Sequence, residues 1–192
     1  MLRVVSGVAR GRKLMVPPIR NIRPTLDRVR EALFNMIRDE IYEKKVLDLF
    51  AGSGALGIEA LSRGARHVVF VDSHMACLKT IEENLRRCGF EDRAELFHGI
   101  IPDCFPTLVR RYDQRYNVIF MDPPYNKCLE SDIFYGLHYF SLVDQHARIV
   151  IEHSARREIK NNLPEIFRLE KKRVYGEVAL SLLIYEPKRK LK

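Results

Sequence analysis

The spacing of apolar residues changes repeatedly along the chain. Short continuous apolar runs, typical of buried strands, alternate with stretches in which apolar residues recur every three or four positions, as in helices. The runs that predict strands are 46–50, 67–71, 117–121 and 147–152, and alternating residues predict a further strand at 94–98. The stretches that predict helices are 55–63, 75–87, 101–112 and 129–141. Strands that alternate with helices predict a parallel sheet covered on both faces.

The first part of the chain departs from this alternation. Residues 2–5 and 13–16 have the pattern of two short strands around a glycine-containing turn. Apolar residues then recur at helical spacing from Leu26 to Ile41. We therefore expect residues 1–45 to form an extension, a hairpin followed by a helix, in front of the alternating region.

The last part of the chain predicts a hairpin. Residues 166–175 and 178–186 are strand-like and are separated only by Gly176 and Glu177. A two-residue connection joins antiparallel neighbours, so the final strand runs against the others. The whole pattern predicts an α/β fold with a mostly parallel seven-stranded sheet and an antiparallel last strand. We expect residues 46–192 to form this main domain, in one compact unit with the extension.

Composition and charge narrow the class of protein. With 192 residues, of which 46% are hydrophobic, the chain can bury one core. We see no secretory leader and no apolar run long enough for a membrane span, so a cytoplasmic protein is expected. The net charge of +8 is concentrated at the ends: residues 1–30 hold eight Lys or Arg against one Asp, and residues 188–192 hold four more. Such segregated positive charge favours a polyanionic partner.

The cysteines give no sign of a metal site. Cys77, Cys88, Cys104 and Cys128 form no C-x-x-C pair and lie at no zinc-finger spacing from a histidine. We interpret them as small apolar side chains, with no disulfide and no metal expected.

A glycine-rich turn supplies the first candidate site. Residues 48–57, of sequence DLFAGSGALG, leave one predicted strand and open a helix. The glycines allow a tight turn and a close approach of the backbone to a ligand. Asp72 ends the next strand, where an acid can accept both hydroxyls of a ribose. Taken alone, the pattern suits a dinucleotide equally well, and Asp72 could also cap the following helix.

The second candidate site follows the fourth strand of the main domain. Asp122, Pro123, Pro124 and Tyr125 lie where the carboxyl ends of neighbouring strands would bring them beside the glycine turn. An amino group on a heteroaromatic ring is a poor nucleophile, because its lone pair is delocalised. Asp122 and the carbonyl of Pro123 could accept its two N–H groups and free that lone pair. The prolines hold the carbonyl in place, and Tyr125 offers a stacking face for an extruded base.

The histidines do not belong to a Ser/His/Asp or Cys/His pattern of the kind found in hydrolase active sites. His67 and His98 lie in predicted strands and are expected to be structural. His153, beside Glu152, follows the fifth strand and could line the cleft, but we assign it no role.

These motifs together resemble the RsmD family of 16S rRNA guanine-N2 methyltransferases over nearly the full chain. The resemblance rests on four segments: the basic opening 6–13, residues 23–35, residues 48–65 and the tetrapeptide 122–125. It implies a Rossmann-like methyltransferase fold, S-adenosylmethionine as cofactor, and a guanine of small-subunit rRNA as acceptor. It also implies that Asp48, Gly52 and Gly54 contact the methionine part of the cofactor and Asp72 its ribose.

One position departs from the pattern of related enzymes. They place an acid after the third strand to read the adenine amino group, whereas this chain has Ile100. We expect adenine to be held here by backbone and apolar contacts, or by Asp103. The expected cofactor contacts are Asp48, Phe50, Ala51, Gly52, Ser53, Gly54, Asp72, Ser73 and Ile100.

The basic opening is expected to hold RNA phosphates. The candidates are Arg10, Arg12, Lys13, Arg23 and Arg28. The expected partner is ribosomal RNA, within a small subunit or its assembly intermediate, bound by a monomer. Three alternatives remain: a DNA or other RNA amino-group methyltransferase acting on adenine N6 or cytosine N4, a nicotinamide-dependent oxidoreductase, and a non-catalytic RNA-binding module.

Overall fold

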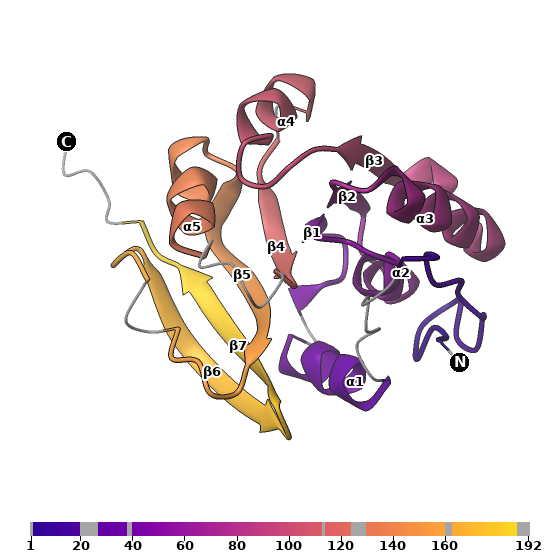
Figure 1. Cartoon of the computed structure of the whole chain (residues 1–192), viewed down its shortest axis with the longest axis horizontal. Coiled ribbons are helices and arrows are strands. Elements are labelled where there is room, and N and C mark those ends of the chain that lie inside the picture. Colours follow the sequence, from indigo (N-terminus) through magenta and orange to yellow (C-terminus); the bar gives the residue numbers. More distant parts are fainter. Residues whose placement is uncertain are drawn as a thin grey trace.

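The computed structural model describes residues 2–19, 27–37, 40–112, 114–123, 130–159 and 163–187. A seven-stranded sheet of order β3-β2-β1-β4-β5-β7-β6 forms its centre (Figure 1). The strands are β1 Lys45–Leu49, β2 His67–Asp72, β3 Ala94–His98, β4 Tyr116–Met121, β5 Val143–Ser154, β6 Phe167–Tyr175 and β7 Val178–Tyr185. Strands β1 to β5 pair in parallel, whereas β7 runs antiparallel to both β5 and β6. The expected fold class and its antiparallel last strand are confirmed.

Helices cover both faces of this sheet. They are α1 Asp27–Met36, α2 Ala55–Ser62, α3 Met75–Cys88, α4 Phe105–Tyr112 and α5 Glu130–Tyr139. One core joins α1, α2, α3 and the N-terminal segment to side chains such as Phe70, Phe120 and Val150. The second core joins α4 and α5 to side chains such as Ile119 and Ile151. Successive strand residues point to opposite faces, which explains why neighbouring residues of one strand enter different cores.

Element boundaries differ from the expected ones in three places. Strand β5 begins at Val143, ahead of the expected 147, because its register with β4 shifts between Tyr116 and Val118. Helix α1 ends at Met36 rather than continuing to Ile41. Residues 101–104 form a turn before α4 instead of its first helical turn. In the last two places, apolar residues at helical spacing are buried without being helical, as Ile41 and Ile101 are.

The segments 2–5 and 13–16 pair with each other as expected, but they do not form regular strands. The segment turns back on itself, but only Arg3 and Lys13 form a β-bridge. Two further hydrogen bonds join its arms: Val4 N–H donates to the Arg12 carbonyl and Leu14 N–H to the Leu2 carbonyl, both at 2.9 Å. The N–H groups of Val5 and Ser6 donate instead to the carboxylate of Glu59 at 2.7 and 2.9 Å. A backbone group that is satisfied by a helix side chain is not available to a strand partner.

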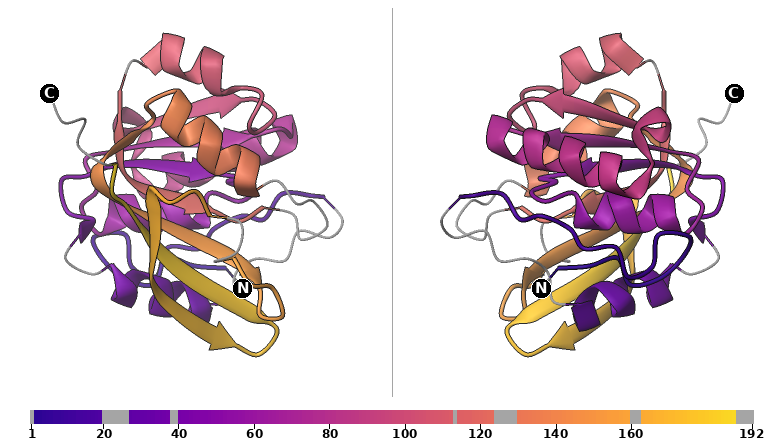
Figure 2. Two further views of the ribbon diagram at one scale, coloured as in Figure 1. Left: turned by 90° about the vertical axis from the view of Figure 1, so that its left-hand side faces the viewer. Right: turned by 90° about the vertical axis from the view of Figure 1, so that its right-hand side faces the viewer.

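The N-terminal segment instead lies along α2 and α3 (Figure 2, right). Val8 donates its N–H to the carbonyl of Ser62 at 2.9 Å, and Ala9 donates to the Ser62 hydroxyl at 3.0 Å. The contact is so close that a Cβ on Gly7 would lie 1.9 Å from the Ser62 carbonyl oxygen. Gly7 also has a φ of 81°, in the left-handed region that favours glycine. Residues 2–15 are therefore packed against the domain rather than extending from it as a tail.

Candidate functional site

Four acidic side chains share one face of the sheet at its carboxyl edge. Asp48 on β1 is in register with Phe70 on β2 and Phe120 on β4, and all three point toward the α1–α3 side. Asp72 and Asp122 each lie two residues beyond those phenylalanines, and Glu152 lies two beyond Val150. Because side chains two apart share a face, the strands themselves align these carboxylates. The acidic row consists of Asp72, Asp48, Asp122 and Glu152.

The glycine loop between β1 and α2 is tied to this row. Phe50, Gly52 and Gly54 have φ values of 61°, 55° and 75°, all in the left-handed region. The N–H of Gly52 donates to Asp72 Oδ2 at 2.9 Å, linking the loop to the end of β2. A Cβ built on Gly52 would meet nothing nearer than 3.9 Å, so the backbone is open on that side. An open glycine backbone beside a buried acid suits the nucleoside part of a cofactor.

Asp48 is the most enclosed carboxyl of the row. Its Oδ2 accepts the N–H of Gly57 at 2.9 Å, which holds the first turn of α2 against β1. Burial raises the pKa of Asp48 to about 8, the Gly57 hydrogen bond opposes that rise, and the charge of Asp72 adds to it. A cationic group bound nearby would relieve the cost of ionising Asp48.

Asp122 follows β4 beside Asp48. Its pKa is raised well above the ordinary range, first by burial and then by the charges of Glu152 and Asp48. Its own side chain is partly exposed, and Pro123 after it is buried. Asp122 therefore offers an acceptor that solvent or a ligand can reach. Pro124 and Tyr125, the other expected catalytic residues, lie outside the described residues.

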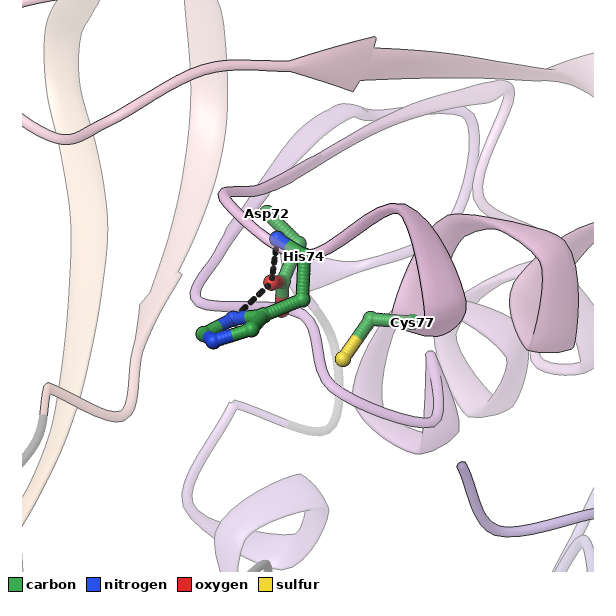
Figure 3. Close-up of side chains that lie close together, drawn as sticks. All are labelled: Asp72, His74 and Cys77. Atoms are coloured by element: carbon green, nitrogen blue, oxygen red, sulfur yellow. Dashed lines mark hydrogen bonds and ion pairs between the residues drawn. The ribbon is translucent and has the colours of Figure 1, made fainter. Parts of the chain in front are cut away.

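Asp72, at the end of β2, is held in place by His74, which directly precedes α3 (Figure 3). Its Oδ1 accepts the backbone N–H of His74 at 2.8 Å and lies 3.3 Å from His74 Nδ1. The ligand-capable atoms of Asp72, His74 and Cys77 all lie within 4.8 Å of one another. However, burial and then the Asp72 charge raise the pKa of the Cys77 thiol to about 12, which disfavours the thiolate that metals bind. The group is better suited to orienting Asp72, a role for His74 that was not predicted from the sequence.

Asn84 on α3 is a further residue that the sequence did not indicate. It is fully buried, and its side-chain amide donates to the carbonyl oxygens of Met15 and Ser53, both at 3.0 Å. Its oxygen accepts the N–H of Met15 at 2.7 Å. One side chain thus joins the N-terminal segment to the glycine loop. Only the tertiary structure brings residues 15, 53 and 84 together.

The remaining expected cofactor residues surround the same edge. Ala51 and Ser53 are buried in the loop, and Ser73 is exposed after β2. Ile100 follows β3 with 64% of its surface exposed. An exposed apolar side chain at this edge suits the face of a purine, as expected. Asp103 is also exposed.

The basic residues of the N-terminal region divide into two kinds. Arg10, Arg12, Lys13 and Arg28 are exposed, as phosphate contacts require. Arg30 is fully buried: its guanidinium donates to the carbonyl of Arg3, and its Nε lies 3.9 Å from Glu59. Arg30 is thus structural. Arg23 and residues 188–192 lie outside the described residues.

The histidines and cysteines have structural surroundings. His153 is buried, with Nδ1 2.9 Å from the Ser154 carbonyl and Nε2 2.9 Å from the Ser181 hydroxyl, on the face opposite Glu152. His98 Nε2 lies 2.9 Å from the Ser73 carbonyl. Cys77, Cys88 and Cys104 are free thiols. Cys77 is buried as expected, Cys88 is only partly buried, and Cys104 is also buried. Cys128 lies outside the described residues.

Among the described residues, no helix combines the length and apolar character that a membrane span requires. The sheet order, the glycine loop after β1 and the acidic edge define a Rossmann-like α/β protein.

Comparison with known proteins identifies the family within this class. The family model "Conserved hypothetical protein 95" matches residues 2–184, and the chain belongs to that family. "Ribosomal RNA small subunit methyltransferase D" of Escherichia coli strain K12 is 34% identical over 94% of this chain and 88% of its own length. The protein of that name from Haemophilus influenzae is 33% identical over 94% and 92%. The resemblance to the RsmD family is confirmed.

The solved structures agree with this assignment. The structure of "Putative methyltransferase yhhF from Escherichia coli" superposes with a TM-score of 0.80 at 32% identity, covering 96% of this chain and 98% of that one. The expected methyltransferase fold is therefore confirmed over nearly the whole chain.

Proposed function

We propose that this protein transfers a methyl group from S-adenosylmethionine to the exocyclic N2 amine of a guanine in small-subunit (16S) rRNA. The observation that carries the proposal is the alignment of Asp72, Asp48 and Asp122 along one sheet edge. It provides a nucleoside-binding acid at one end and an amine acceptor at the other. The names of the relatives favour ribosomal RNA over other acceptors.

The chain's own residues fit the cofactor. Asp72 accepts the ribose hydroxyls, since each of its oxygens keeps a lone pair beyond its bonds to Gly52 and His74. The open backbone at Gly52 and Gly54, with Asp48 behind it, holds the methionine part. Phe50, Ala51, Ser53 and Ser73 complete the cradle, and Ile100 packs against adenine.

Residues 122–125 act on the amine. Asp122 accepts one N–H of the amine and the Pro123 carbonyl accepts the other, which orients the nitrogen lone pair toward the methyl group. Pro124 fixes the turn, and Tyr125 stacks on the base. When bound, the cofactor supplies a methyl group on a sulfonium sulfur: the nitrogen lone pair bonds to that carbon, the carbon–sulfur pair stays on sulfur as a thioether, and one amine proton passes to solvent.

The N-terminal extension, residues 1–45, holds the RNA. Arg10, Arg12, Lys13 and Arg28, together with Arg23, contact phosphates and position the RNA without reading its sequence. The substrate is rRNA in a small subunit or an assembly intermediate, and the enzyme acts as a monomer.

The alternatives differ in what they leave unexplained. An oxidoreductase would give no role to Asp122 or to the exposed arginines, and a non-catalytic RNA-binding module would not need the acidic row. A DNA methyltransferase would leave unexplained why the relatives are named for small-subunit ribosomal RNA.

Methyl transfer from labelled S-adenosylmethionine to small-subunit rRNA, assembling subunits and duplex DNA tests the proposal. We expect label in the rRNA-containing substrates and none in DNA, and its loss with Asp122→Ala. Label in DNA, or equal labelling by the variant, would refute it.

A further inference from the structure

Glu152 is a buried carboxyl that lies directly beside Asp122, the proposed amine acceptor. Met121 on β4 pairs with Ile151 on β5, so the parallel register brings the next residues, Asp122 and Glu152, side by side. Both point to the α1–α3 face, and Leu180 on β7 lies opposite Glu152 on its other side. Only 8% of the surface of Glu152 is exposed.

Glu152 is electrostatically coupled to Asp122. Glu152 lies near a second carboxyl in an enclosed environment, and its charge helps to raise the pKa of Asp122. Its neighbours toward the sheet interior, such as Val150 and Leu180, are apolar. Carboxyls whose pKa values are strongly raised by burial and a neighbouring charge concentrate at functional sites.

We propose that Glu152 is the residue that selects guanine, by accepting the ring N1–H while Asp122 accepts an N–H of the adjacent N2 amine. This inference rests on the proposed function and names the base-reading residue of that site. Guanine is the base with a ring N–H directly beside its exocyclic amine on the Watson–Crick edge, so two adjacent carboxylates match two adjacent donors. Adenine and cytosine carry an unprotonated ring nitrogen beside their amines, and its lone pair would face the Glu152 carboxylate. The same side chain therefore excludes N6 and N4 methylation.

The analogue 2-aminopurine, which lacks both N1–H and the O6 carbonyl of guanine, tests this contact when the wild type is compared with Glu152 variants. It keeps the amine at position 2 but has an unprotonated N1, so it retains the proposed partner of Asp122 and loses that of Glu152. The test uses the full-length enzyme and two synthetic RNAs, with guanosine or 2-aminopurine riboside at the labelled position. For each RNA, kcat/KM is measured with wild type, Glu152→Gln and Asp122→Asn.

Wild type should prefer guanine by at least about 100-fold, as sites built around a substrate N–H do. In Glu152→Gln the side-chain amide can donate to the unprotonated N1, so the preference should fall by at least ~10-fold. Asp122→Asn should slow both RNAs by a similar factor. Glu152→Asp, which keeps the charge, should retain the preference for guanine at a reduced rate. S-adenosylmethionine binding, measured by calorimetry, should be unchanged in Glu152→Gln, which would also show that this variant is folded.

Equal slowing of both RNAs by Glu152→Gln, with the guanine preference intact, would overturn the inference and leave Glu152 as a structural residue. The proposed function would survive that result. If wild type labels neither RNA but methylates an adenine or cytosine elsewhere, the proposed function fails, and the base-reading role fails with it.

Discussion

Asn84 donates a hydrogen bond from its side-chain amide to the carbonyl of Ser53 at 3.0 Å. The same carboxamide bonds both backbone groups of Met15. The basic N-terminal segment and the cofactor loop thus share one buried polar side chain. In the proposed mechanism, one segment holds RNA and the other holds the methyl donor, so their relative position is set through this residue.

Asn84→Ala should weaken both functions. It removes three hydrogen bonds and leaves buried backbone groups unsatisfied, for which we expect a loss of about 1–3 kcal/mol in the free energy of unfolding. Urea unfolding measures that loss, and calorimetry measures the accompanying fall in S-adenosylmethionine affinity. Asn84→Asp is the matched control, because it can still accept the Met15 N–H but cannot donate to Ser53. Unchanged cofactor affinity in both variants would contradict a link through Asn84.

Asp48→Asn should stabilise the protein without cofactor. Folding raises the pKa of Asp48 to about 8, so the unfolded chain ionises first as pH rises. Wild type therefore loses stability from near pH 4 up to about pH 8, by an amount on the order of a few kcal/mol, and then levels off. Asparagine keeps an acceptor for the Gly57 N–H and removes this penalty.

The measurement is thermal unfolding of both proteins between pH 5 and pH 9, with and without S-adenosylmethionine. The advantage of Asp48→Asn should grow from pH 5 to pH 8, whereas its stabilisation by cofactor should be smaller than that of wild type. A constant difference in Tm across this range would show that Asp48 does not titrate as described.

The pH dependence of methyl transfer should reflect Asp122. Burial, with the charges of Glu152 and Asp48, raises its pKa, and the ionised carboxylate is the better acceptor for the amine. The single-turnover rate should therefore increase with pH and reach its plateau well above the ordinary pKa range of an aspartate. Asp122→Asn should be slow and lack this dependence. A plateau already reached near pH 5 in wild type would be inconsistent with the role.

Removing exposed positive charges from the N-terminal segment should weaken RNA binding by reducing the electrostatic contribution to the binding free energy. For Arg10→Ala combined with Arg12→Ala, we expect the slope of log affinity against log salt to decrease by about 1–2. The control is Arg110→Ala with Arg111→Ala on α4, which covers the opposite face of the sheet. If the control has the same effect, binding depends on overall charge rather than on the N-terminal segment.

The sequence was sufficient for most of the fold because hydrophobic periodicity reports burial directly. Strands such as β1 and β4, buried on both faces, appear as continuous apolar runs, and Gly176 identifies the final hairpin. Periodicity failed where burial occurs without regular structure. Val4 and Leu14 are buried in the N-terminal segment and pair across it, with Arg12 and Leu2. Other backbone groups of the segment bond to α2 and α3, so no regular strand forms.

The site was predictable only where its residues lie in short motifs. Asp72 and Asp122 were indicated by their positions at strand ends, and Asp48 by the resemblance to the RsmD family. Asn84 and Glu59 were not, since each acts on a segment more than fifty residues away. The position of Glu152 could have been predicted, because it comes two residues after the apolar Val150 on the strand next to Asp122. Residues two apart on a strand point to the same face, and the expected strand order puts this strand beside Asp122. Together these two facts would have placed Glu152 in the acidic row.

The most direct test of the account is the identity of the methylated nucleoside. Small-subunit rRNA from cells lacking this protein is incubated with the purified enzyme and labelled S-adenosylmethionine, digested to nucleosides and separated by chromatography. The account predicts label in N2-methylguanosine and in no other nucleoside, and no label with Asp122→Ala. Label in N6-methyladenosine or N4-methylcytidine would contradict it, as would a wild-type enzyme that binds rRNA and cofactor but transfers no methyl group.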